Sequence, residues 1–272
     1  MTAAAGRPPP AVLAAYGLKG SPDPLAGGQR TSWRVGPAVV KPLDMDPTML
    51  RWQGALLSRL QGRTDFRVSV PLRTVAGRWT TDGWSAWRYE PGAHTPRRWH
   101  DIIAVGRQMH AALESDPEPA FLRDRTDKWA IGDRVAWGEL PASDWAGVKH
   151  LNELTAALRP VALRHQLIHG DLTGNVLFDA HLPPLVIDFS PYWRPPTFAS
   201  AIVIADALLF EDADEEVLEP LLEDPSFPQC LVRALIYRAV ADHLARPHLR
   251  RHDEGDRYRS AARIAIRLAT SA

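Results

Sequence analysis

Short apolar runs separated by turn residues characterise the first third of the chain. Residues 31–36 and 38–43 predict two strands on either side of a Gly-Pro turn. Residues 68–79 and 83–89 have the same character and predict two further strands. We therefore expect a β-rich segment that extends over residues 11–90.

Helical spacing dominates the rest of the chain. One early helix follows Asp46, a residue suited to an N-cap, with Pro47 at its first position and Gly62 as its stop. After Pro91-Gly92, apolar residues recur every three or four positions, as on one face of a helix. These patterns predict helices over residues 99–113, 147–159, 199–210, 229–245 and 256–269.

The order of these elements predicts an α+β protein with two lobes. Residues 1–10, rich in alanine and proline, are predicted to form a disordered tail. Residues 11–90 would form a β-rich N-lobe, and residues 91–272 a mainly helical C-lobe. The sequence contains no internal repeat.

The composition is that of a globular protein and disfavours several function classes. Among the 272 residues 45% are hydrophobic, and 32 basic residues balance 32 acidic ones. Because the formal net charge is zero, electrostatics give no reason to expect binding to nucleic acid or to an anionic membrane. Arginine far outnumbers lysine, and with abundant alanine and proline this suggests a GC-rich bacterial genome.

The single cysteine, Cys230, excludes an internal disulfide and a cysteine-based metal cluster. We expect it to be buried and structural, in a protein kept in a reducing cytoplasm. Three consecutive prolines follow the short apolar stretch at the N-terminus, which argues against a signal peptide. No run approaches the ~18 apolar residues of a membrane helix. The sequence thus predicts a cytoplasmic protein.

The candidate chemistry lies in the stretch LIHGDLTGNVLFDAHLPPLVIDFS, residues 167–190. Two short strands that end near each other would bring Asp171, Asn175 and Asp188 together. Two carboxylates and an amide oxygen form a set of hard oxygen ligands, which suits Mg²⁺ with its bound waters and phosphate oxygens. One carboxylate can bind the metal while the other accepts a hydroxyl proton.

The motif HGDLTGN followed by VIDF resembles the catalytic and metal loops of the aminoglycoside phosphotransferase-like family, within the protein-kinase-like fold. Protein kinases carry arginine where this sequence has Gly170, whereas the small-molecule kinases typically carry glycine. The resemblance implies that Asp171 is the catalytic base or orients the acceptor hydroxyl. It also implies Asn175 and Asp188 as Mg²⁺ ligands, with His169 bracing the loop.

Upstream segments follow in the order of the same family. LAGGQRTSWRV resembles its nucleotide-binding hairpin, and VVKP resembles the strand whose lysine contacts the α- and β-phosphates. GWSAWRYEPGA resembles the strand and linker whose backbone holds adenine, and RQMHAAL resembles a helix end in which His110 packs structurally. The resemblance implies ATP contacts at Gly27, Gly28, Thr31, Ser32, Lys41, Arg88 and Tyr89.

One departure from the family pattern concerns the catalytic loop. The family spaces its catalytic aspartate and metal asparagine five residues apart, whereas Asp171 and Asn175 are four apart. A missing residue shifts the far end of a loop by up to ~3.5 Å. Gly174 would therefore have to form a tight turn that returns Asn175 to the metal.

A second departure concerns the partner of Lys41. The family pairs this lysine with a helix glutamate, but the helix after Asp46 contains none, and Gln53 stands at the aligned position. Gln53 can hydrogen-bond an ammonium group without neutralising it. Asp44 or Asp46 would have to supply the missing charge.

Several segments are candidates for the acceptor side. The acidic stretch 210–225 would either attract a cationic acceptor or form the solvated start of a helix. Trp193 and Arg194 would either wall the acceptor pocket or belong to the core, with Arg194 ion-paired. Trp129 and Asp133 are further candidates for lining it.

These features predict an ATP- and Mg²⁺-dependent phosphotransferase that acts on a hydroxyl of a small molecule, such as a sugar, an aminoglycoside-like compound or another metabolite. The alternative is a catalytically weak nucleotide-binding regulatory protein of the same fold, a pseudokinase. A protein kinase is disfavoured by Gly170 and by the lack of a long activation segment.

Overall fold

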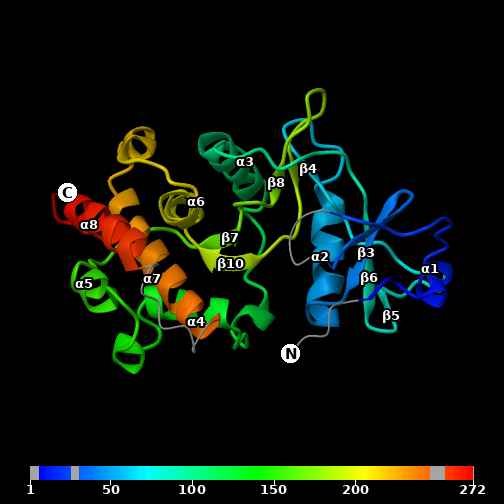
Figure 1. Ribbon diagram of the computed structural model, residues 1–272, viewed down its shortest axis with the longest axis horizontal. Coiled ribbons are helices and arrows are strands. Elements are labelled where there is room, and N and C mark those ends of the chain that lie inside the picture. Colours follow the sequence, from blue (N-terminus) through cyan, green and yellow to red (C-terminus); the bar gives the residue numbers. More distant parts are fainter. Residues whose placement is uncertain (1–5, 26–30, 246–254, 272) are drawn as a thin grey trace. The chain divides into compact units, whose positions relative to one another are not determined.

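A computed structural model describes residues 6–25, 31–245 and 255–271. The chain divides into two compact units, shown with their elements in Figure 1. The first contains the described part of Met1–His94 together with Asn175–Phe189, and the second contains Thr95–Gly174 and the described part of Ser190–Ala272. The sequence predicted one boundary, after residue 90, and did not predict that residues 175–189 belong with the β-rich unit.

The first unit contains two small sheets. The larger sheet has the strand order β1-β2-β3-β6-β5, with all pairs antiparallel. In the smaller sheet β9 pairs with β8 antiparallel and with β4 parallel, which ties residues 175–189 to this unit. The strands are β1 (Asp23–Pro24), β2 (Trp33–Val35), β3 (Ala38–Pro42), β4 (Arg67–Val68), β5 (Thr80–Thr81), β6 (Trp84–Arg88), β8 (Val176–Leu177) and β9 (Leu185–Val186).

The helix predicted after Asp46 forms as α2 (Pro47–Arg59). The Asp46 carboxylate accepts a hydrogen bond from the Thr48 N–H at 2.7 Å, and Pro47 takes the first helical position. Both features satisfy or remove N–H groups that the first turn leaves without an intrahelical partner. The Asp46 carboxylate is thus the N-cap of α2.

Two local predictions were wrong. Residues 68–79 do not form a strand, because Pro71 has no N–H and joins Trp87 of β6 only through an isolated bridge. The predicted tail, residues 1–10, is ordered at its end, since α1 (Pro10–Ala15) begins at Pro10; residues 1–5 lie outside the described residues. Val12 buries its side chain in a cluster with core residues of β2, β3 and β6, which holds α1 in place.

The second unit is mainly helical, as predicted. Its elements are α3 (Trp99–Ala112), η1 (Ala120–Leu122), α4 (Lys128–Ala136), η2 (Ala142–Trp145), α5 (Leu151–Ala156), β7 (Gln166–His169), β10 (Pro191–Arg194), α6 (Pro196–Phe210), η3 (Glu215–Leu221), α7 (Phe227–Ala245) and α8 (Gly255–Ser271). β7 and β10 form an antiparallel pair in which Pro191 lies opposite His169.

Helix α7 is the centre of this unit. It packs against α4, α6 and α8 (Figure 1), and its residues 227–241 are all buried. A helix that is covered on every side is normally apolar all round. Within α7, however, Arg233 and Arg238 are buried charged residues. Each needs a specific partner, because an unpaired buried charge is very unfavourable.

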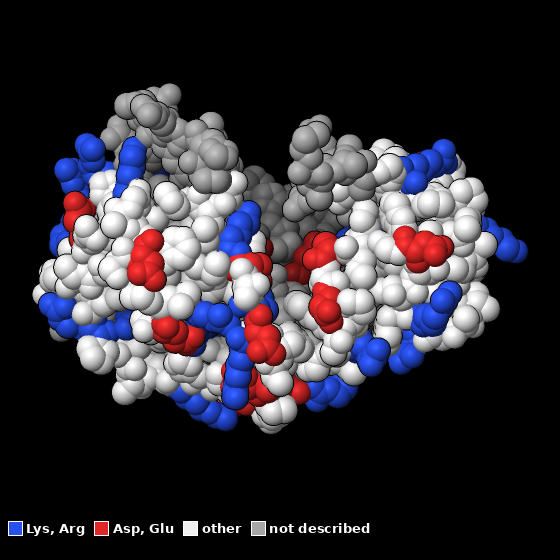
Figure 2. Space-filling view, turned by 90° about the horizontal axis from the view of Figure 1, so that it is seen from below, with Lys and Arg blue, Asp and Glu red and all other residues white. Residues whose placement is uncertain are grey.

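The surface and the single cysteine agree with the composition. Figure 2 shows basic and acidic side chains interspersed among the described residues of the face it presents. No helix in the described ranges combines the length and apolar character needed to cross a bilayer. Cys230 lies fully buried in α7, and burial raises the pKa of its thiol to about 12, so it is a structural residue, as expected.

Candidate active site

Lys41 is the centre of the charged cluster in the first unit. Strand β3 carries it, and only 8% of the residue is exposed. Its Nζ atom lies 2.8 Å from Oδ1 of Asp188 and 3.1 Å from Oδ2 of Asp44. Burial by itself lowers the pKa of the lysine, but the two carboxylates outweigh burial and raise it. Lys41 is therefore a fixed cation at neutral pH.

The sequence left open whether Asp44 or Asp46 pairs with Lys41, and the structure shows that Asp44 does. Gln53, at the position where the family has its helix glutamate, is fully buried and donates from Nε2 to the Phe189 carbonyl at 2.8 Å. It thus holds the main chain next to Asp188 and does not bond to Lys41. Asp44, three residues beyond the lysine, supplies the second carboxylate, while Asp46 caps α2.

The two predicted metal ligands lie at the open end of the β8–β9 hairpin. Asn175 precedes β8 and Asp188 follows β9, and the Ile187 N–H donates to the Asn175 carbonyl at 2.9 Å. Gly174 adopts φ +78°, the left-handed conformation that a tight turn requires and that glycine adopts without strain. The turn at Gly174 thus brings Asn175 to the level of Asp188 within this unit.

The donors at this hairpin fit Mg²⁺. Asp188 has φ +46°, an uncommon conformation for a non-glycine residue, and its side chain is 53% exposed. A metal there can keep several waters, as Mg²⁺ prefers. Within the described ranges no group of three or more His, Cys, Asp or Glu side chains could hold a metal ion. The ion would therefore depend on one amide oxygen, one carboxylate and water.

The other predicted nucleotide contacts differ in their burial and hydrogen bonding. Gly27 and Gly28 lie outside the described residues, while Thr31 and Ser32 are partly buried just before β2. Arg88 ends β6 and Tyr89 follows it, but both of their N–H groups already donate to carbonyl groups of this unit, those of Val70 and Pro37. An adenine ring held along this linker would have to use other groups than these two amides.

In the second unit, two buried histidines support the predicted catalytic loop. Asp171 follows β7 by two residues, and its N–H donates to Nδ1 of His169 at 3.1 Å. The His169 N–H in turn donates to Nε2 of His110 at 3.0 Å. Both rings accept a bond from a main-chain N–H, so His169 braces the loop and His110 packs structurally, as the resemblance implied.

Burial, and to a smaller extent the neighbouring His169, lowers the pKa of His110 from 6.5 to about 3. Between these values the unfolded chain binds a proton at this position and the folded chain does not. Stability should therefore fall as the pH drops below 6.5, by about 1.4 kcal/mol per pH unit from this residue. Urea unfolding between pH 7 and pH 4 checks this, with His110→Gln as the comparison, because glutamine keeps an acceptor and does not titrate. Equal pH slopes for the two proteins would contradict the assignment.

Gly170 has a steric role in this fold. A Cβ atom at this position would lie 2.6 Å from Cε2 of Tyr192 and closer still to Cδ2. The tyrosine cannot move aside, because its ring is buried under Arg125 and its hydroxyl lies 3.1 Å from that of Tyr237. The packing of Tyr192 thus excludes a side chain at Gly170.

We expect Gly170→Ala to destabilise the protein by about 1–3 kcal/mol, the usual range for overpacking. Urea unfolding measures this loss. Combined with Tyr192→Val, which removes the ring, the same substitution should cost clearly less. Additive losses in the double variant would show that the tyrosine ring is not the obstacle.

One charged partner of Asp171 is a residue that the sequence did not single out. Arg238 of α7 donates from Nη2 to Oδ1 of Asp171 at 3.0 Å. It also forms two bonds of 2.6 Å to Asp206 of α6, which is 4% exposed. One guanidinium thus links the buried carboxylate of Asp206 to the carboxylate of Asp171. The only sequence signal for it was an arginine within an apolar helix.

The acidic stretch 210–225 has structural partners. Glu211 accepts from the Trp99 indole N–H at 2.8 Å, and Asp214 caps η3 by accepting from the Glu216 N–H. Glu215 pairs with Arg267. These contacts favour the interpretation as a helix start over that of a cation-binding surface.

The comparisons with known proteins concern the fold. No family model and no curated protein matches the sequence. Among solved structures, an aminoglycoside phosphotransferase from Alicyclobacillus acidocaldarius subsp. acidocaldarius DSM 446 matches with a TM-score of 0.65 and 16% identity, over 98% of this chain and 96% of its own.

The chain has the protein-kinase-like fold of the aminoglycoside phosphotransferases. Two further structures support this. Amicoumacin kinase hAmiN in complex with AMP-PNP, Ca²⁺ and Ami has a TM-score of 0.57 and 13% identity, covering 92% of this chain and 88% of its own. A thermostable mutant of aminoglycoside phosphotransferase APH(4)-Ia in ternary complex with ADP and hygromycin B has the same TM-score and identity, covering 94% and 96%. The predicted fold class is thereby confirmed for this kinase-like chain.

Proposed function

We propose that this chain is an ATP- and Mg²⁺-dependent phosphotransferase that moves the γ-phosphoryl group of ATP to a hydroxyl of a small molecule. The observation that carries the proposal is the bonding of the buried Lys41 to Asp188, the aspartate of the VIDF stretch, at 2.8 Å. Phosphoryl transfer needs positive charge on the phosphates and carboxylate oxygens for the metal, and this pair supplies both groups.

The proposal assigns a part of the reaction to each unit. Residues 11–90 would bind the nucleotide, and residues 91–272 would contribute the catalytic base and the acceptor site, apart from the β8–β9 hairpin with its metal ligands. The nucleotide contacts we propose are Gly27, Gly28, Thr31, Ser32, Lys41 and the linker at Arg88 and Tyr89. A nucleotide site in this chain is supported by the similar structures that contain AMP-PNP or ADP.

Asp171 would act on the acceptor. Arg238 donates to its Oδ1 atom at 3.0 Å and orients the carboxylate, which would accept a hydrogen bond from the acceptor hydroxyl. As the hydroxyl oxygen bonds to the γ-phosphorus and the bond to the leaving ADP breaks, the hydroxyl proton passes to Asp171. Asn175 and Asp188 would hold Mg²⁺, which when bound neutralises charge on the phosphate oxygens.

The alternative function, a nucleotide-binding regulatory protein with weak turnover, has one observation in its favour. Asp188 is bonded to Lys41 itself, and no helix glutamate draws the lysine away, since Gln53 bonds to Phe189. If that pair persists with nucleotide bound, Oδ1 of Asp188 is less available to a metal. The protein would then bind ATP and release little ADP.

A metabolite screen tests the proposal. The protein is incubated with ATP, Mg²⁺ and a library of hydroxylated metabolites, and products are detected by mass spectrometry. We expect one compound class to gain the mass of one phosphoryl group with an equal amount of ADP, and no product when EDTA removes Mg²⁺. Tight ATP binding without any phosphorylated product would favour the regulatory alternative.

A further inference from the structure

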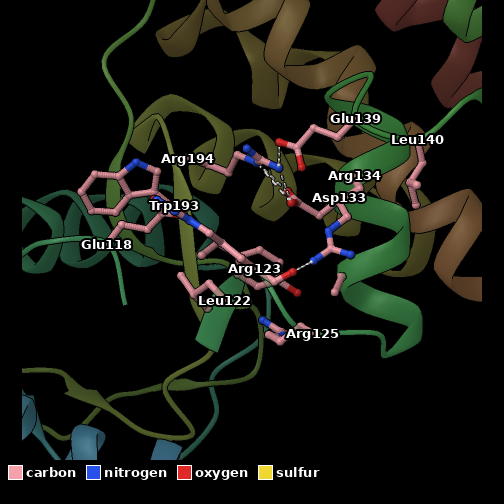
Figure 3. Close-up of a pocket in the computed structure, with 12 residues that line it drawn as sticks. Glu118, Leu122, Arg123, Arg125, Asp133, Arg134, Glu139, Leu140, Trp193 and Arg194 are labelled. Carbon is pink, nitrogen blue, oxygen red and sulfur yellow. Dashed lines mark hydrogen bonds and ion pairs between the residues drawn. The ribbon is translucent and has the colours of Figure 1, made fainter. Parts of the chain in front are cut away.

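The second unit contains a pocket of about 320 Å³ that none of the predicted nucleotide or metal contacts lines (Figure 3). This volume is at the low end of the range for small-molecule sites, ~300–1,000 Å³. Three segments form it: residues 118–125, residues 130–134 of α4 with Glu139 and Leu140 beyond the helix, and residues 192–194 of β10. All of them belong to the same compact unit.

An ion cluster around Arg194 lines the pocket. Arg194 is 8% exposed and bonds to Asp133 through three contacts of 2.7–3.1 Å. The same guanidinium lies 2.7 Å from Oε1 of Glu139, as Figure 3 shows. One positive charge is thus shared between two carboxylates. Asp133 is buried and receives three of the bonds from Arg194. The carboxylate that is only partly neutralised is therefore that of Glu139, whose side chain is 49% exposed.

Arg134 also lines the pocket and has a positive charge that no carboxylate of the described residues neutralises. Its Nη2 atom donates to the main-chain carbonyl of Arg123, a neutral acceptor (Figure 3). Among the ion pairs of the described residues none includes Arg134, whereas Arg123 pairs with Glu118 and Arg125 pairs with Asp127. A guanidinium has five N–H donors, and this bond uses one of them.

Arg134 and Glu139 are close together at the end of α4. The Glu139 N–H donates to the Arg134 carbonyl at 2.8 Å, so both side chains start from one turn of the backbone. The pocket therefore presents one guanidinium and one carboxylate that its own residues do not fully neutralise. Leu122, Leu140 and Trp193 add apolar surface around them. A ligand with both an anionic and a cationic group matches this arrangement better than a polycation or a simple anion.

The pocket is linked to the catalytic loop through β10. Arg125, which lines the pocket, donates to the Pro191 carbonyl at 3.1 Å. The carbonyl of the preceding residue, Ser190, accepts the N–H of Gly170 at 2.9 Å, and Gly170 directly precedes Asp171. A ligand seated in the pocket therefore lies beside the strand that supports the proposed catalytic base.

We propose that this pocket binds a small zwitterion whose carboxylate contacts Arg134 and whose ammonium group contacts Glu139. Arg194, which holds Glu139, lies opposite Gln166 at the end of β7 remote from Asp171, so this site is separate from the one proposed for the phosphorylated hydroxyl.

Four related compounds test the two charges separately. L-threonine carries both charges, N-acetyl-L-threonine only the carboxylate, L-threoninamide only the ammonium group, and N-acetyl-L-threoninamide neither. Binding to the full chain without nucleotide is followed by ¹⁹F NMR of 5-fluorotryptophan-labelled protein, with the Trp193 signal assigned by Trp193→Phe. We expect threonine to bind at least about threefold more tightly than either singly charged compound, as for partly exposed ion pairs.

Two variants identify the groups responsible. Arg134→Gln should abolish the preference for a free carboxylate and keep the preference for a free ammonium group, and Glu139→Gln should do the reverse. Arg263→Gln and Glu219→Gln make the same charge changes at exposed positions outside the pocket and should change neither preference. Thermal unfolding of all four variants checks that the fold is intact.

Three results would overturn the assignment: equal binding of the four compounds, preferences that persist in both pocket variants, or no shift of the Trp193 signal with any compound. These outcomes are distinct from failure of the proposed function. Charge-dependent binding at Arg134 and Glu139, together with no phosphorylated product in the metabolite screen, would contradict the phosphotransferase proposal and leave the zwitterion site standing.

Discussion

An Asp171→Asn variant is expected to transfer phosphate about 10²–10⁴-fold more slowly than the unchanged protein, because an amide cannot accept the acceptor's proton. The fold should be preserved, since the amide oxygen can still accept the bond from Nη2 of Arg238. The measurement is ADP release with the best acceptor from the metabolite screen, at saturating ATP and Mg²⁺. The loss should lie in kcat, because the base acts mainly in the transition state.

The matched control is Asp144→Asn, an exposed aspartate in η2 of the same unit. It makes the same chemical change away from the catalytic loop and should leave the rate unaltered. Equal rates for Asp171→Asn and the unchanged protein would remove Asp171 from catalysis, and with it the assignment of HGDLTGN as a catalytic loop. A loss of thermal stability common to both variants would point to a structural effect.

Replacing Arg238 with methionine should have the largest effect on stability, about 3–5 kcal/mol. Asp206 is 4% exposed and receives two 2.6 Å bonds from Arg238, so the substitution leaves a buried carboxylate without its cation. Burial already raises the pKa of Asp206 even with the arginine present. The variant should therefore recover part of its stability as the pH falls and Asp206 takes up a proton. Urea unfolding at pH 7.5 and pH 5.5 measures both effects.

A second substitution separates stability from catalysis. Arg238→Met combined with Asp206→Leu removes both buried charges, and replacing such a pair with apolar residues is often neutral for stability. The double variant should unfold near the free energy of the unchanged protein. Its rate should nevertheless stay about 10–100-fold lower, because Asp171 has lost the guanidinium that orients it. We thus regard Arg238 as a positioning residue for the base.

Arg233→Met is the control for this experiment, because Arg233 is also buried in α7 but bonds to the carbonyl of Arg159 and to Gln229. Its loss leaves no buried carboxylate and should reduce stability without changing kcat. Full activity in the Arg238 and Asp206 double variant would show that the contact with Asp171 has no catalytic role. A stability loss in Arg238→Met no larger than in Arg233→Met would contradict the buried-charge argument.

The sequence by itself predicted those features of the fold that depend on residues close together in the chain. The N-cap at Asp46, the strand around Lys41 and the helices α2, α3 and α5 to α8 follow from residues within a few positions of one another, whereas α1 and α4 were not predicted. The motif HGDLTGN with VIDF predicted the fold through a resemblance, and solved structures confirm the fold. Residues 68–79 were misassigned because an apolar run also suits an irregular segment interrupted by Pro71.

The tertiary structure decided every question that depended on a distant partner. It showed Asp44 beside Lys41 and Gln53 on the Phe189 carbonyl, although the sequence left both open. It brought Arg238 to Asp171, 67 positions away in the chain. It also assembled the pocket around Arg134 from three separate segments. Local patterns of polarity determine which elements form, whereas the partner of a buried charge depends on how helices pack, and that packing is set by contacts between segments far apart in sequence.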